Sequence, residues 1–255
     1  MTGIKTTQAP SVAGKKGFSL ISDEKFRQLY AALLQCKMLD ERLQAAPDHN
    51  TPHYEAWMGR EASAAAIVSC LRPGDSITPT PRAVLASYLH SNSLPPACSP
   101  STPQAQLAAA NDDALRHKLR KRGNVTVVFA CAAQPASIGN FFAAATKQSL
   151  PVLYVLEGGT PSAELCQGIP VIHVDASDAV AIYRVACESI TRARDEVGPT
   201  ILECTPWPGG SHSTDPLLKL ERYLAGRRLF RPQWRLQLEQ KYAGSIDKAV
   251  RSILN

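Results

Sequence analysis

Cys131 stands at the end of an apolar run, Val125 to Cys131, and is flanked by alanines on both sides. Such small neighbours permit the sharp strand-to-helix turn on which some hydrolases present a nucleophile. A cysteine hydrolase also needs a base within hydrogen-bond reach, for which His173 and His212 are the candidates. Because most buried cysteines are inert small hydrophobes, a structural role for Cys131 is the favoured interpretation.

Two short apolar runs, Val125 to Cys131 and Pro151 to Glu157, must position this residue. Both are rich in β-branched and aromatic residues and too short for helices, which predicts buried parallel strands. The stretch from Ser137 to Leu150 has room for one crossover helix. Ligands of such sheets bind beyond the carboxyl ends of the strands, which here means Ala130 to Gln134 and Gly158 to Pro161.

The remaining elements alternate in the middle of the chain and are helical at its two ends. Strands are predicted at 77–79, 170–174 and 200–205, and helices at 22–43, 59–72, from Thr80, 104–122, 177–197, 217–226, 232–243 and 245–254. This order predicts an α/β fold, a doubly wound parallel sheet with helical N- and C-terminal extensions. Residues 1–17 are expected to be a disordered tail and residues 18–255 a single domain.

Composition excludes several classes of protein. The chain has 44% hydrophobic and 20% charged residues and a net charge of +6, which is ordinary for a globular protein. The basic run Arg116 to Arg122 lies in the last turns of a predicted helix and has no interleaved aromatic residues, so no nucleic-acid partner is expected. Neither a membrane span nor a secretory signal is evident.

The cysteines are odd in number and form no framework. There are seven, without a Cys-x-x-Cys pair, scattered through predicted helices, strands and loops. This pattern predicts reduced thiols and a cytoplasmic location.

Several short motifs follow one another in a fixed order along most of the chain. They are Ile21-Ser-Asp-Glu24, Leu39-Asp-Glu-Arg42, Gly59-Arg-Glu-Ala62, Leu71-Arg-Pro-Gly-Asp75, Leu150-Pro-Val-Leu-Tyr-Val-Leu-Glu157, Gly168-Ile-Pro-Val-Ile-His-Val-Asp175, Gly198-Pro-Thr-Ile-Leu-Glu203 and His212-Ser-Thr-Asp-Pro216. In this order they resemble the alpha subunit of the decarboxylating component of 2-oxo acid dehydrogenase complexes, of the pyruvate or branched-chain type. The resemblance implies a thiamine diphosphate-binding fold and a beta-type partner subunit.

The positions that bind the cofactor in that family differ here. The family holds the diphosphate through Mg²⁺, whose ligands are an aspartate in Gly-Asp-Gly and an asparagine in Glu-Asn-Asn. This chain has Ala130-Cys-Ala-Ala133 and Glu157-Gly-Gly159 instead, and no acidic residue lies between Asp113 and Glu157. Mg²⁺ requires oxygen ligands. We therefore expect no metal site, and only vestigial loops at Cys131, Ala132, Gly158 and Gly159.

Two residues match functional positions of the family. Arg82 lies where the family has an arginine that contacts the diphosphate, but the favoured interpretation is a solvated arginine in a first helical turn. His212 lies where the family has an active-site histidine, but an isolated histidine in a Gly-Ser turn is more often a local hydrogen-bond partner. Glu61 is interpreted as a helix-start charge and Asp175 as a strand-end turn residue.

Together these observations predict a pseudoenzyme: an alpha-subunit-like protein that has lost thiamine diphosphate and Mg²⁺ binding and acts as a structural or regulatory partner. The partner is expected to be a beta-type subunit or a second copy of the chain. Two alternatives stay open. One is an active thiamine diphosphate-dependent oxidoreductase subunit with unorthodox ligands, and the other is a cysteine hydrolase using Cys131.

Overall fold

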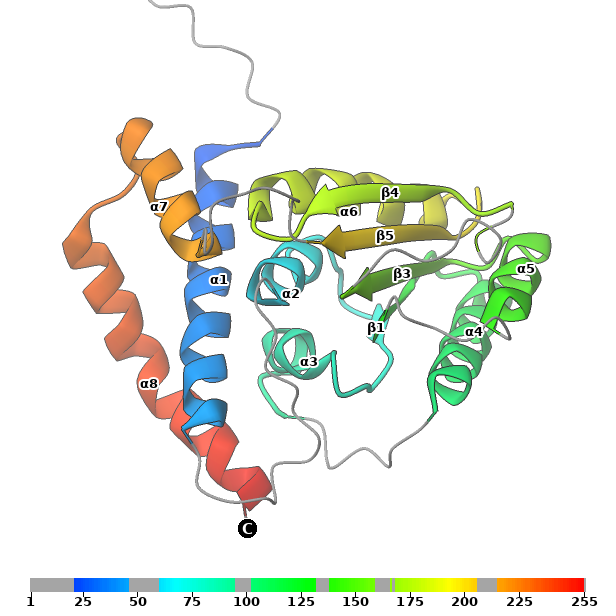
Figure 1. Cartoon of the computed structure of the whole chain (residues 1–255), viewed down its shortest axis with the longest axis horizontal. Helices are drawn as coiled ribbons and strands as arrows, with labels where there is room; N and C mark the ends of the chain where they lie inside the picture. Colours follow the sequence, from blue (N-terminus) through cyan, green and yellow to red (C-terminus); the bar gives the residue numbers. More distant parts are fainter. Residues whose placement is uncertain are drawn as a thin grey trace, which may run out of the picture.

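The computed structural model describes residues 21–45, 60–94, 102–131, 138–158, 166, 168–205 and 215–254 (Figure 1). The predicted tail, residues 1–17, lies outside these ranges.

A parallel sheet forms the centre of the structure. Its strands are β1 (Ser76–Ile77), β2 (Thr126–Cys131), β3 (Val152–Glu157), β4 (Val171–Asp175) and β5 (Thr200–Thr205). All neighbours pair in parallel, in the order β1-β2-β3-β5-β4. β3 is buried along its whole length, as expected of a central strand that is covered on both faces.

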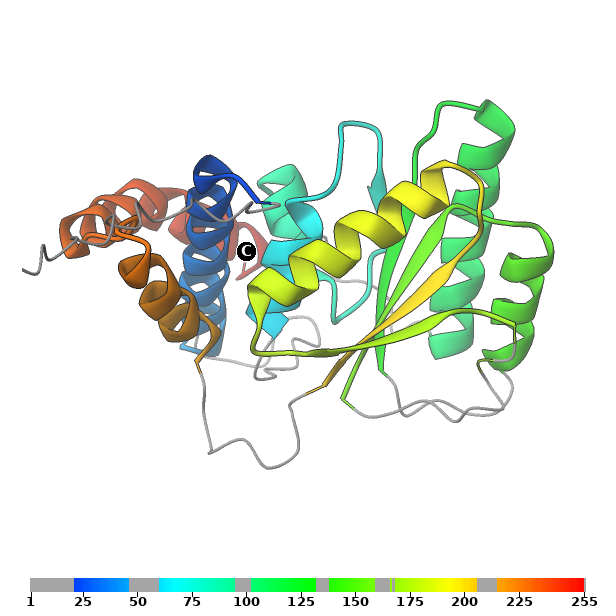
Figure 2. The same ribbon diagram turned by 90° about the horizontal axis from the view of Figure 1, so that it is seen from above.

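Helices cover both faces of the sheet and create two cores. On one face, α2 (Arg60–Val68) and α6 (Ala179–Arg194) pack against alternate strand residues, including Phe129 and Val155. On the other, α4 (Pro103–Arg120) and α5 (Gly139–Lys147) pack against Val128 and Tyr154 (Figure 2). The predicted doubly wound fold is confirmed, including the crossover helix between β2 and β3.

The helical extensions gather at one end of the molecule (Figures 1 and 2). They are α1 (Asp23–Gln44), α7 (Pro216–Gly226) and α8 (Pro232–Leu254), and α3 (Val84–Ser91) lies between them and the sheet. The predicted cap of α1 is confirmed, because the Ser22 side chain accepts a hydrogen bond from Lys25 N at 3.1 Å. None of the helices in the described part of the chain is both long and apolar enough to cross a bilayer.

Two predicted helix boundaries were wrong. The helix expected from Thr80 begins at Val84. The Thr80 hydroxyl does accept a hydrogen bond from Ala83 N at 3.1 Å, as a capping residue would, but it also donates one to Phe129 O at 2.9 Å. These bonds hold residues 80–83 as a turn against β2. The two helices expected after Pro232 form one, α8, because the cost of Gly244 inside a helix is only about 1 kcal/mol.

The expectation that every cysteine is reduced is also wrong. Cys70, just after α2, forms a disulfide with Cys187 in α6, with 5.2 Å between their Cα atoms. The two residues are 117 positions apart in the sequence. Only the fold brings them together, so the absence of a cysteine framework in the sequence gave no indication of the bond. Among the described residues, Cys36, Cys131, Cys166 and Cys204 take no part in a disulfide.

Candidate functional site

The carboxyl ends of three strands place one polar residue each in a row. Cys131 on β2 pairs in register with Glu157 on β3, and Glu157 pairs with Cys204 on β5. Register partners in a sheet point to the same face, so all three side chains lie on the face covered by α2 and α6. Glu157 is the central member of this row.

Three side chains from α2 and the turn before α3 converge on the Glu157 carboxyl group. Ser63 Oγ donates a hydrogen bond to Oε1 at 2.6 Å, and Arg60 Nε lies 3.4 Å from Oε2. Arg82 Nη1 lies 3.8 Å from the same oxygen. We call these four residues the Glu157 cluster. Arg60 and Ser63 are one helical turn apart, so the start of α2 aims both at the end of β3.

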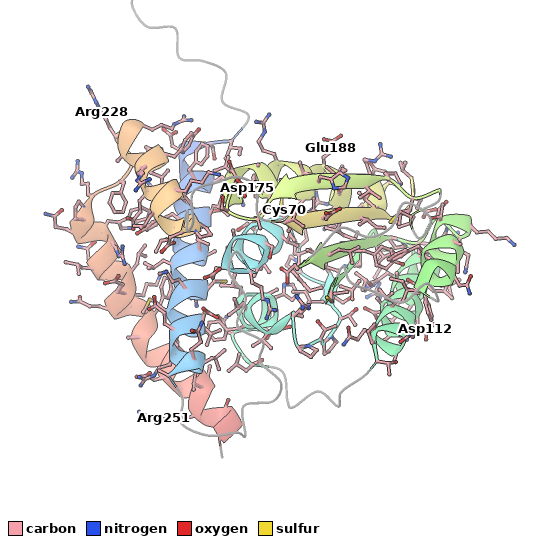
Figure 3. The ribbon with its side chains drawn as sticks, viewed as in Figure 1. Cys70, Asp112, Asp175, Glu188, Arg228 and Arg251 are labelled. Carbon is pink, nitrogen blue, oxygen red and sulfur yellow. A yellow bond between two sulfur atoms is a disulfide. The ribbon has the colours of Figure 1, made fainter. Side chains whose placement is uncertain are left out.

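The Glu157 cluster is almost completely buried. Arg60 and Glu157 are both 2% exposed, and the Arg82 side chain is 10% exposed. By contrast, charged residues such as Asp112, Arg228 and Arg251 are exposed and lie at the periphery of the molecule (Figure 3). Arginines and glutamates are rarely buried unless they are paired.

Burial dominates the electrostatics of the Glu157 cluster. It raises the pKa of Glu157 above the ordinary value for a glutamate, although Arg60, Ser63 and Arg82 each lower it. Glu61 raises it further through like-charge repulsion. Nearby on α1, burial and Glu61 raise the pKa of Asp40 to about 6. The chain thus holds carboxyl groups in an unfavourable environment at this end of the sheet, which is more common at functional sites than elsewhere.

The expectation of a solvated Arg82 in a first helical turn is wrong. The residue precedes α3 and lies in the turn that Thr80 ties to β2, which directs its guanidinium toward Glu157. The sequence also gave no prominence to Arg60, Ser63 or Glu157. The one available signal was a carboxylate that ends an otherwise apolar strand, because such a group needs a buried partner.

The other candidate residues are not brought together. His173 forms an ion pair with Glu203, its Nδ1 lying 2.7 Å from Oε2. Glu203 is in register with Leu156, so this pair lies on the face opposite Cys131. Two strands, β3 and β5, also separate β4 from β2. The structure therefore excludes His173 as the base for Cys131.

Three further residues singled out in the sequence lie outside the described ranges: His212, Ala132 and Gly159. Gly158 is described and directly follows β3 with a φ of +82°, a conformation that favours glycine. Glu61 lies in the first turn of α2, and Asp175 accepts a hydrogen bond from Ser177 N at 2.9 Å, so both structural interpretations are confirmed.

The described residues do not fit a magnesium diphosphate. Among them, no group of three or more histidine, cysteine or acidic side chains is placed to hold a metal ion. The carboxylate nearest to the expected site, Glu157, already accepts from Ser63 and faces two guanidinium groups. A divalent cation there would be repelled by both arginines.

Fold and site together define a class: an α/β protein with a parallel sheet that carries a buried carboxylate-arginine cluster at the carboxyl ends of its strands. Comparison with known proteins narrows this class. Residues 159–217 match the family model described as "Dehydrogenase E1 component". The chain is also similar to pyruvate dehydrogenase E1 component alpha subunits.

The similarity is distant but extends along most of the chain. The Staphylococcus epidermidis subunit is 22% identical over 92% of this chain and 80% of its own length. The Staphylococcus aureus subunit is 23% identical over the same shares. The chloroplastic alpha-3 subunit of Arabidopsis thaliana is 30% identical, but the match spans only 32% of this chain and 24% of that protein. These findings confirm the resemblance seen in the sequence: the chain is distantly similar to E1 alpha subunits.

Proposed function

We propose that this protein is a non-catalytic E1 alpha-like subunit that does not bind thiamine diphosphate with Mg²⁺ and acts as a structural or regulatory partner. The observation that carries the proposal is the Glu157 cluster. In it, the carboxylate next to the positions of the family's metal ligands faces Ser63, Arg60 and Arg82, so it is not available to replace the missing aspartate and asparagine.

Charge balance supports this proposal. Mg²⁺ prefers carboxylate, carbonyl and water oxygens in octahedral geometry. At the end of β2 the chain offers Cys131, whose sulfur is a soft donor that suits other metals. At the end of β3 the buried cations Arg60 and Arg82 face the position that a metal would share.

The proposed partner is a beta-type E1 subunit, or a second copy of this chain. The alpha-like scaffold is retained, with both cores filled and the terminal helices packed on α1, although its cofactor positions differ. An alpha-like fold that does not bind the cofactor can still use its surface to contact a partner subunit. An obligate interface of this kind is expected to bury more than about 2,000 Å² in total.

Isothermal titration calorimetry tests the loss of cofactor binding. The full chain is titrated with thiamine diphosphate at saturating Mg²⁺, and an established thiamine diphosphate enzyme is titrated in the same buffer as a positive control. We expect no heat of binding from this chain. A magnesium-dependent dissociation constant in the micromolar range would contradict the proposal and favour an active oxidoreductase subunit.

Light scattering after size-exclusion chromatography tests the partner. The chain is run alone and after co-expression with a beta-type E1 subunit. We expect a stable complex larger than one chain in at least one of the two samples. A monomer in both would contradict the proposed role as a partner subunit.

A further inference from the structure

We infer that Arg60, Ser63 and Arg82 form a binding site for a small oxyanion, and that the carboxylate of Glu157 occupies this site as a built-in ligand. The inference concerns this chain's own residues and holds whether or not the protein pairs with another subunit.

The three donors come from separate parts of the fold and meet at one carboxyl group. Arg60 and Ser63 start α2, whereas Arg82 lies in the turn before α3. Ser63 is fully buried and donates to Oε1 at 2.6 Å, while both arginines face Oε2. Two guanidinium groups and a hydroxyl around one point are the donor set that proteins use for carboxylate and phosphate groups.

The contacts between Glu157 and the two arginines are looser than those of a well-formed ion pair. Glu157 Oε2 is buried and accepts no hydrogen bond from the described residues. The two arginine nitrogens approach that oxygen only to 3.4 and 3.8 Å, beyond the usual range of a charge-assisted hydrogen bond. The attraction is therefore electrostatic, and it does not depend on the geometry of the glutamate side chain.

Removal of the Glu157 carboxylate leaves two buried cations without that counter-charge. The Glu157→Ala substitution also removes a volume close to that of an acetate ion. An acetate ion from solution then finds space, a hydroxyl donor and two positive charges. In the wild-type protein the same site is closed, because Glu157 is tethered in it by the chain.

Thermal unfolding with added acetate tests this inference. The melting temperatures of wild-type protein and E157A are measured at pH 7.5 in increasing sodium acetate, with sodium chloride at equal ionic strength as the reference. We expect E157A to melt below the wild type. Acetate at about ten times its dissociation constant should then raise the melting temperature of E157A by about 2–4 °C, with saturation. The wild type should show no shift beyond that in chloride.

Two matched variants show whether the described donors are responsible. E157A/R82Q keeps the space but lacks one cation, so the acetate shift should be reduced or lost. E203A removes a buried carboxylate from the neighbouring strand, where the partner is His173 on the other face, and should show no acetate-specific shift.

The inference is overturned if acetate stabilises E157A no more than chloride does, or if E157A/R82Q responds as strongly as E157A. If E157A does not fold in chloride, the refolding yield in acetate and in chloride is compared instead. Equal yields would then overturn it. Calorimetry with thiamine diphosphate is a separate measurement on the wild type, so failure of one proposal is distinguishable from failure of the other.

Discussion

The two ends of the sheet each bury a carboxylate beside arginine, but they satisfy it differently. At the amino end, both oxygens of Asp75 accept hydrogen bonds from Arg194, and Asp75 also accepts from Val125 N at 3.0 Å and Arg72 N at 2.7 Å. At the carboxyl end, Glu157 accepts one hydrogen bond from Ser63 and has looser contacts with its arginines. Both oxygens of Asp75 are thus hydrogen-bonded, whereas Oε2 of Glu157 accepts no hydrogen bond from the described residues.

The neighbouring acids follow the same division. At the amino end, burial raises the pKa of Asp113, but hydrogen bonds from Ser76 and Arg116 outweigh it and lower this pKa. At the carboxyl end, burial prevails and raises the pKa of both Glu157 and Asp40. Unfavourable electrostatics are thus concentrated at Glu157 and Asp40. Asp175, at the carboxyl end of β4, differs from them, because hydrogen bonds from Ser177 and Lys219 lower its pKa.

The largest effect is expected from the amino end. Asp75→Asn removes the charge partner of Arg194, whose side chain is 9% exposed, and should lower the free energy of unfolding by about 3–5 kcal/mol. Urea unfolding at pH 7.5 measures this change. The control is R192Q, at an exposed position on the same helix, which should change stability by no more than about 0.5 kcal/mol. Similar changes in the free energy of unfolding for both variants would contradict the stabilising role of the Asp75–Arg194 pair.

The second effect concerns the link between the two ends. α2 begins at the carboxyl end with Arg60, α6 supplies Arg194 to the amino end, and the disulfide between Cys70 and Cys187 joins these helices. Replacing both cysteines by serine should cost about 2–4 kcal/mol, because the unfolded chain regains the freedom of a long loop. Guanidinium unfolding of both proteins, with and without dithiothreitol, is the measurement. Reductant should destabilise only the wild type, and equal effects on both proteins would contradict the disulfide.

The third prediction concerns Glu157 and can be compared directly with the prediction for Asp75. Glu157→Gln keeps an acceptor for Ser63 and resembles the protonated carboxyl group, which the raised pKa of Glu157 shows to be favoured in the folded state, so this variant should be at least as stable as the wild type at pH 7.5. Because the folded-state pKa of Glu157 is raised, wild-type stability falls as pH rises above the unfolded pKa of about 4.3. The stability of E157Q relative to the wild type should therefore increase with rising pH. A loss larger than that of D75N would reverse the comparison.

The sequence predicted the fold well where hydrophobic pattern alone decides. The β-branched runs ending at Cys131 and Glu157 became adjacent parallel strands, and the capping residue Ser22 starts α1. It failed where long-range contacts decide. Thr80 bonds to β2 instead of starting a helix, and Cys187 meets Cys70 across 117 positions.

The sequence predicted where in the fold the candidate site lies, but not which residues contact one another there. Parallel-strand topology located it at the ends of β2 and β3, and the substitutions at Cys131 and Gly158 indicated altered chemistry. Local patterns could not show that Arg60 and Arg82 would meet Glu157, because each contact joins residues at least 75 positions apart. The residue types alone predicted that the chain lacks ligands for Mg²⁺, whereas only the structure shows the Glu157 cluster.

The smallest expected effect concerns Asp40, where burial and a hydrogen bond shift the pKa in opposite directions. Asp40 on α1 is 9% exposed and accepts a hydrogen bond from Gln44 at 2.6 Å, yet its pKa is raised to about 6 by burial and by Glu61. A raised pKa means that the folded state keeps its proton to higher pH than the unfolded state, whose pKa is about 3.9. Stability contributed by protonated Asp40 is thus lost as pH rises from about 4 to 6.

Asp40→Asn mimics the protonated form and keeps an acceptor for Gln44. It should raise the free energy of unfolding at pH 7.5 by about 1 kcal/mol, and the gain should vanish near pH 4. Urea unfolding across this range measures the change. The control is E41Q, the exposed neighbour that pairs with Lys37 at 3.7 Å, which should change stability by less than about 0.5 kcal/mol. A D40N variant that is less stable at pH 7.5, or whose gain does not depend on pH, would show that bonding outweighs burial at this end too. The contrast between the two ends of the sheet would then rest on Glu157 alone.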